Sequence, residues 1–99
     1  MEKLVEQGLL FDFYGELLNE HQKEVYGLLV NNDFSVSEIA EEYGISRQAA
    51  SDLIKRIDKI LFSYESKLNL VGRFTKIRDI ITESSEIPEN IKEKILKEL

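Results

Sequence analysis

Residues 35–56 read SVSEIAEEYGISRQAASDLIKR, and this stretch has the pattern of two short helices joined by a tight turn. Ser35 and Ser46 are good N-cap residues, because a serine hydroxyl accepts a hydrogen bond from the first turn of the helix that follows. Gly44 ends the first of the two helices, since glycine readily adopts the left-handed conformation. The spacing predicts a helix-turn-helix unit over residues 35–61.

The apolar residues of this stretch fit a shared core beneath the turn. Ala40 is small enough for the two helices to cross closely. We expect four residues to lie inward: Ile39, Ile45, Ala50 and Leu53. The second helix then presents its first turn outward, directly after the Ser46 cap.

Helical periodicity extends over the whole chain, which predicts a single domain of residues 1–99. Its fold class is all-α, with a sigma-like helix-turn-helix in a bundle of five or six helices and a long recognition helix. Two helices precede the unit in residues 1–34, and further helices follow in residues 62–99. The predicted helices are residues 3–18, a helix capped by Asn19, residues 36–43, a helix from Ser46 toward Leu68, residues 74–82 with Gly72 near the boundary, and a last helix from Pro88 with Ile91, Ile95 and Leu99 inward.

Composition excludes several classes of protein. The 99 residues contain no cysteine and a single histidine, so neither a disulfide framework nor a thiolate metal site is expected. No phosphate-binding glycine loop and no nucleophile motif is present, and we expect neither an enzyme nor a cofactor. The acidic start lacks the basic segment of a secretory signal, and the apolar runs are too short to span a membrane. A cytoplasmic location without membrane contact is therefore expected.

Charge is distributed unevenly along the chain, whose net charge is −6. Residues 1–45 carry two basic and ten acidic side chains, whereas residues 46–80 carry eight basic and four acidic ones. The positive segment begins at the second helix of the unit, where it could meet phosphate locally. The acidic first half repels nucleic acid at longer range, which favours a protein or ribonucleoprotein partner over bare duplex DNA.

If the unit binds nucleic acid, the outward residues of its second helix would make the contacts. Arg47 and Gln48 suit guanine and adenine edges, and Lys55, Arg56 and Lys59 suit phosphates. The complete candidate set is Ser46, Arg47, Gln48, Ser51, Asp52, Lys55, Arg56 and Lys59. A solvated helix face is the alternative interpretation of the same pattern.

Two resemblances start from these residues. Residues 18–61 resemble the C-terminal helix-turn-helix region of bacterial sigma factors, through LNEHQKEV at residues 18–25, Ile39-Ala40 and GISR at residues 44–47. A second, closer resemblance is to the YlxM family of small helix-turn-helix proteins of Gram-positive bacteria, over residues 10–70. It is carried by LFDFYGELL at residues 10–18, SEIAEEYGISRQA at 37–49, Asp52, IKR at 54–56, Ile60-Leu61 and YESKL at 64–68.

The resemblance to the YlxM family implies an accessory role in the signal recognition particle pathway, because genes of this family stand beside those of the particle. It brings no catalytic residues. The chain departs from the family's pattern at Ala50-Ser51, where a β-branched residue and an aromatic one are usual. That departure affects the contact surface more than the fold.

Three functions therefore remain open from the sequence. The first is an accessory or regulatory protein whose partner is a signal recognition particle component. The second is a sequence-specific transcription regulator that binds duplex DNA, and the third is a protein-interaction module that docks through the long helix. A helix from Ser46 toward Leu68 is long for so small a domain, so we also expect a homodimer that covers its apolar stripe.

Overall fold

The computed structural model describes residues 2–99, and within them it contains six α-helices and no strand. The predicted all-α class is confirmed. The helices are α1 (Lys3–Tyr14), α2 (Glu20–Asn31), α3 (Val36–Tyr43), α4 (Arg47–Leu68), α5 (Leu70–Glu83) and α6 (Glu89–Lys97), with a short 3-10 helix η1 (Gly15–Leu17) after α1. The chain divides into two compact units, one ending at Leu68 and one spanning Asn69–Leu99. One domain over residues 1–99 stays a prediction.

Side-chain caps begin three of the helices, as the sequence predicts. The Asn19 carboxamide oxygen accepts the Gln22 backbone N–H at 2.8 Å, and the Gln22 side chain accepts the Asn19 N–H. Ser35 and Glu38 form the same reciprocal capping box at the start of α3. At the start of α4 the Ser46 hydroxyl accepts the Ala49 N–H at 3.0 Å.

The turn between α3 and α4 depends on Gly44. Its φ of +62° and ψ of +36° place it in the left-handed region. The N–H of Gly44 donates to the carbonyl of Glu41, and the N–H of Ile45 donates to the carbonyl of Ala40 at 3.0 Å. These bonds form a Schellman motif, which satisfies the last carbonyls of α3 and redirects the chain into α4.

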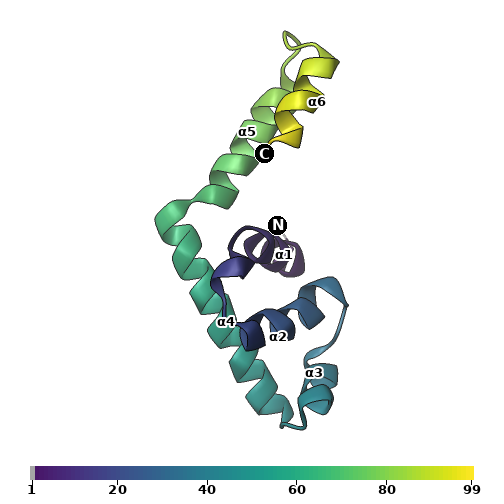
Figure 1. Cartoon of the computed structure of the whole chain (residues 1–99), viewed down its shortest axis with the longest axis vertical. Helices are drawn as coiled ribbons and strands as arrows, with labels where there is room; N and C mark the ends of the chain where they lie inside the picture. Colours follow the sequence, from purple (N-terminus) through teal and green to yellow (C-terminus); the bar gives the residue numbers. More distant parts are fainter. Residues whose placement is uncertain (1) are drawn as a thin grey trace. The chain divides into compact units, whose positions relative to one another are not determined.

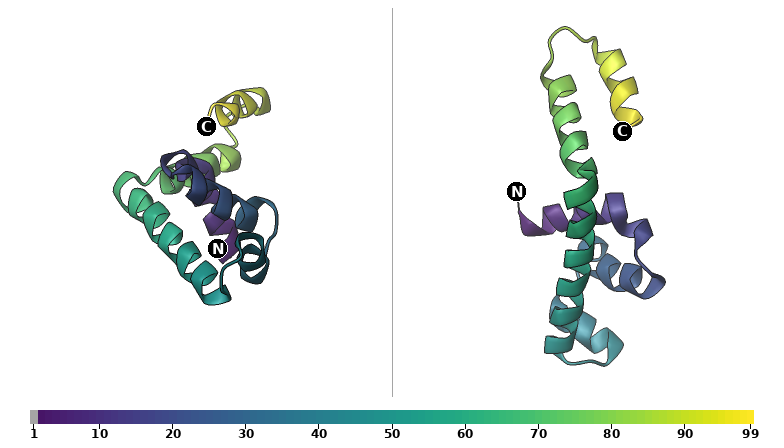
Figure 2. Two further views of the ribbon diagram at one scale, coloured as in Figure 1. Left: turned by 60° about the horizontal axis from the view of Figure 1, so that its bottom comes forward. Right: turned by 90° about the vertical axis from the view of Figure 1, so that its left-hand side faces the viewer.

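The inner face of α4 is the centre of the first unit (Figure 1). Its buried residues Ala50, Ile54, Ile57 and Leu61 contact α1, α2 and α3. Helix α1 lies across α4, and α2 and α3 lie beside its first half (Figure 2). The partners across this core are Leu10, Tyr14, Leu18, Val25, Tyr26, Ile39 and Ala40. The stripe of α4 is therefore covered within the unit as far as Leu61, without a second copy of the chain.

Two details of the first unit differ from the predictions. Ile45 is 38% exposed and not in the core, because the left-handed glycine before it turns the chain at the surface. The first helix ends at Tyr14 and tightens into η1. There Gly15 lies against the Phe11 ring, which an added Cβ would approach to 3.1 Å.

The boundary predicted near Gly72 is wrong: α4 ends at Leu68 and α5 starts at Leu70, four residues before the predicted Phe74. The break falls at Asn69, whose φ of +52° is a conformation that asparagine tolerates better than most residues. Gly72 lies inside α5, and a Cβ there would stand 2.2 Å from the Asn69 carboxamide oxygen. Glycine at this position thus leaves space for the Asn69 side chain.

The second unit is a hairpin of α5 and α6, which lie side by side (Figure 1). Ile81 and Lys92 are buried in it, and the Lys92 ammonium donates to the Thr82 carbonyl at 3.2 Å. The expectation that Ile91, Ile95 and Leu99 lie inward is wrong, because their exposed fractions are 39%, 37% and 47%. Lys92, and not an isoleucine, occupies the inner position of α6, since its ammonium satisfies the carbonyl end of α5.

Gly44→Ala and Gly8→Ala form a matched pair that tests the turn. Neither added methyl group has an atom within 4 Å, so crowding has no effect at either site. We expect Gly44→Ala to lower the free energy of unfolding by about 1 kcal/mol, because a Cβ is strained at positive φ. We expect Gly8→Ala, in the middle of α1, to raise it by about 0.5–1 kcal/mol. Urea unfolding of both variants measures this, and equal changes of the same sign would contradict it.

Candidate nucleic-acid interface on helix α4

The outer face of α4 carries the residues that the sequence singled out for nucleic acid. The structure places seven of them at the surface: Ser46, Arg47, Gln48, Asp52, Lys55, Arg56 and Lys59. Ser51 is partly covered, so it is the member least available to a partner. The face is distinct from the buried stripe of α4, and no residue of it belongs to the core.

Side chains in the first turn of α4 already have hydrogen-bond partners. The Arg47 Nε donates to the Ser37 hydroxyl at 3.1 Å, which links the first turn of α4 to α3. The Gln48 side-chain amide donates to the Asp52 carboxylate at 2.9 Å, one helical turn further on. Neither bond uses all the hydrogen-bonding groups of its side chain, because Arg47 keeps its terminal guanidinium N–H groups and Gln48 keeps a second amide N–H and its oxygen.

Three cations follow on the same face. Lys55, Arg56 and Lys59 surround a shallow depression, to which Asp52 contributes the single carboxylate. Within residues 2–99 these three cations make no ion pair, in contrast to Lys23 on α2, which contacts Glu16 at 3.0 Å. A patch with three cations and one carboxylate suits phosphate groups, which need positive charge without base recognition.

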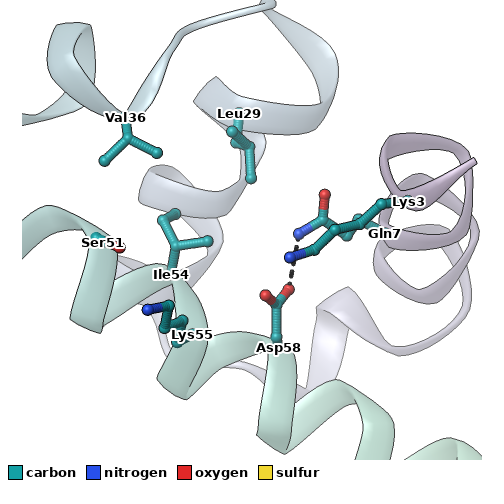
Figure 3. Close-up of a pocket in the computed structure, with 8 residues that line it drawn as sticks. All are labelled: Lys3, Gln7, Leu29, Val36, Ser51, Ile54, Lys55 and Asp58. Carbon is teal, nitrogen blue, oxygen red and sulfur yellow. Dashed lines mark hydrogen bonds between the residues drawn. The ribbon is translucent and has the colours of Figure 1, made fainter.

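A pocket lies beside this face, where α4 meets the other three helices of the first unit (Figure 3). Ser51 and Lys55 line it from α4, together with Val36 from α3 and Leu29 from α2. Lys55 lies at the boundary between the pocket and the cationic depression, since it contributes to both. Ser51 faces the pocket, which explains its partial burial.

The inner end of this pocket holds a polar contact that the sequence analysis did not identify. The Asp58 carboxylate accepts a hydrogen bond from the Gln7 side-chain amide of α1 at 3.0 Å (Figure 3). It also accepts one from the hydroxyl of Tyr26 on α2, whose side chain is fully buried. The sequence signal that could have identified this site is the helical position of Asp58. It lies four residues after Ile54 and three residues before Leu61, so it falls on the inward stripe of α4.

Burial raises the pKa of the Tyr26 phenol, and the hydrogen bond to Asp58 raises it further. The Tyr43 phenol, which donates to the Glu24 carboxylate at 2.6 Å, has a pKa raised to about 12 by partial desolvation and by that hydrogen bond. Both phenols therefore stay neutral in the folded chain where free tyrosine would ionise. His21 contacts Tyr43 through its ring edge, with the ring centroids 5.5 Å apart.

Residues 2–99 contain neither a metal-binding cluster of side chains nor a helix suited to cross a membrane. No group of three or more histidine, cysteine or carboxylate side chains gathers where it could hold a metal ion. Among the helices that the structure describes, none combines the length and apolar composition needed to cross a bilayer.

Comparisons with known proteins support the same type of unit. A family model described as "Putative helix-turn-helix protein, YlxM / p13 like", UPF0122, matches residues 1–99. The chain is 42% identical over 93 residues to YlxM of Bacillus subtilis and to a UPF0122 protein of Bacillus velezensis, covering 94% of this chain and 84% of each relative. It is 53% identical over 73 residues to a UPF0122 protein of Clostridium botulinum, covering 74% and 67%.

The raised pKa values predict a loss of stability in alkali. In the unfolded chain tyrosine ionises near pH 10. The folded chain holds these protons more tightly, so the free energy of unfolding should fall as the pH rises above about 10. Tyr26→Phe should flatten this dependence, because it removes one of the two phenols with a raised pKa. Urea unfolding from neutral pH to about pH 11 measures the slope, and an undiminished slope in Tyr26→Phe would contradict the assignment.

Proposed function

The chain belongs to the UPF0122 family of YlxM- and p13-like helix-turn-helix proteins, and on that basis we propose that it is a cytoplasmic accessory or regulatory protein that acts by binding and not by catalysis. The proposed partner is a component of the signal recognition particle, contacted through the outer face of α4. The observation that carries the proposal is the cationic patch of Lys55, Arg56 and Lys59. It is exposed and takes no part in the core.

Charge favours a ribonucleoprotein as the partner. The cations of α4 can contact an RNA backbone, while the ten acidic side chains of residues 1–45 repel a long nucleic acid that extends beyond the patch. A short structured RNA that is bound to its own protein extends less far beyond the patch. The acidic side chains therefore repel it less than they repel a long nucleic acid.

A duplex-DNA regulator is the second candidate, favoured by the position of Arg47 and Gln48. Both side chains lie in the exposed first turn after the Ser46 cap, which is where recognition helices place base-reading residues.

Alanine substitutions in the cationic patch test the first candidate. We expect Lys55→Ala, Arg56→Ala and Lys59→Ala each to weaken binding to signal recognition particle RNA. Each substitution should also lower the salt slope, which is the change of the logarithm of the binding constant with the logarithm of salt concentration, by about one, because one phosphate contact is lost. Lys94→Ala, an exposed lysine of α6, is the matched control and should change neither. Fluorescence anisotropy at several salt concentrations measures both quantities. Binding that is unaffected by all three substitutions would refute a role for the patch.

Arg47→Ala separates the two candidates. If the chain reads duplex DNA, this substitution should cost about 1–3 kcal/mol at a preferred site, whereas Lys59→Ala should weaken all sequences alike. If the partner is the particle, a mixed-sequence duplex should bind weakly from the outset and Arg47→Ala should change little. Nanomolar, sequence-selective duplex binding at physiological salt, abolished by Arg47→Ala, would establish the regulator in place of the accessory protein.

A further inference from the structure

Six apolar side chains of the second unit are between 37% and 60% exposed. On α5 these are Leu70, Ile77 and Ile80, with exposed fractions of 43%, 42% and 60%. On α6 they are Ile91 and Ile95, and Leu99 follows shortly after the end of the helix, each more than one third exposed. Six aliphatic side chains in 31 residues are far more than scattered surface residues would give.

The two rows fall on the same face of the hairpin. The more buried side of α5 carries Phe74 and Ile81, and at about 100° per residue Leu70, Ile77 and Ile80 lie roughly 20°, 40° and 100° to one side of Ile81. Helix α6 contacts α5 through the side of Lys92 and Leu96, and its exposed row is displaced by a similar angle. Because the helices run antiparallel, these displacements bring both rows to one face.

A hairpin of this size does not hold itself together by its own core. Ile81 and Lys92 are its buried side chains, and units below about 40 residues generally need a disulfide, a metal or association with another chain. The chain contains no cysteine, and no metal-binding group of side chains occurs in residues 2–99. Association with another apolar surface is a further means of stabilising α5 and α6.

We propose that this apolar face docks onto the same face of a second copy of the chain, so that two hairpins form an isologous four-helix bundle. Two antiparallel helices with a flat apolar face are half of such a bundle, and a two-fold axis supplies the other half. Covering the face in both copies removes on the order of 1,000 Å² from water, the lower bound for a specific interface.

Charge also favours a second copy over other occupants of this face. Residues 69–99 carry six basic and six acidic side chains, so two hairpins meet without net repulsion. The first unit carries the whole net charge of −6, and association through that part would oppose like charges. The dimer predicted from the length of α4 is thus assigned to α5 and α6, because α1, α2 and α3 cover the inner stripe of α4.

The double variant Ile80→Glu with Ile95→Glu tests this interface in the full chain. We expect the unsubstituted chain to sediment as a dimer at tens of micromolar, and the double variant to raise the dissociation constant at least about tenfold, since each buried carboxylate would be unpaired. Leu17→Glu and Phe62→Glu are matched controls, because these side chains are 56% and 55% exposed in the first unit. Both controls should remain dimeric.

Amide hydrogen exchange provides a second measurement, which reports on α5 and α6 directly. Protection of residues 70–97 should rise with protein concentration, and the variant Ile80→Gln with Ile95→Gln should lose that protection while α2 and α4 keep theirs. A monomer with concentration-independent protection would show that the hairpin docks on its own chain and would overturn the proposal. So would a dimer that survives the double glutamate variant and is lost in Phe62→Glu.

Discussion

The Asp58 carboxylate is the contact on which the arrangement of the first unit depends. It joins three helices at one point, because it accepts hydrogen bonds from Gln7 of α1 and from Tyr26 of α2. Tyr26 is fully buried, and a buried phenol without an acceptor costs about 1–3 kcal/mol. A shift of α4 by a single turn would leave the Tyr26 hydroxyl without its acceptor. The apolar side chains of the core supply most of the stability, but this contact selects one register among the many that aliphatic side chains would accept.

Local structure was largely predictable from the sequence, because its causes lie within a few residues of each other. The bounds of α3 follow from Ser35 and Gly44, and both ends agree with the prediction. The length of α4 likewise follows from the Ser46 cap and an uninterrupted apolar period up to Leu68. Outward placement of the candidate residues followed from the same period, with Ser51 as the exception because α3 lies close to it.

Features that depend on contacts between distant segments were not predicted. In the sequence, Asp58 is one more charged residue on a helix. Its hydrogen-bond partners Gln7 and Tyr26 lie 51 and 32 residues away, so local sequence does not reveal them. The break at Asn69 was missed because glycine is the stronger local signal for a helix end, whereas Gly72 remains helical. In α6 an amphipathic pattern gave the right helix and the wrong inner side, since Lys92 finds a backbone carbonyl of α5.

The two faces of α4 have different consequences for how the protein changes over evolutionary time. Substitutions on the inner face alter the core and are removed by selection for folding, whereas most surface substitutions change stability by less than about 0.5 kcal/mol. Lys55, Arg56 and Lys59 lie outside the core, so substitutions there alter the outer surface of α4 with little effect on folding. One helix can thus keep a constant architecture while the chemistry of its outer face changes, without compensating changes elsewhere in the chain.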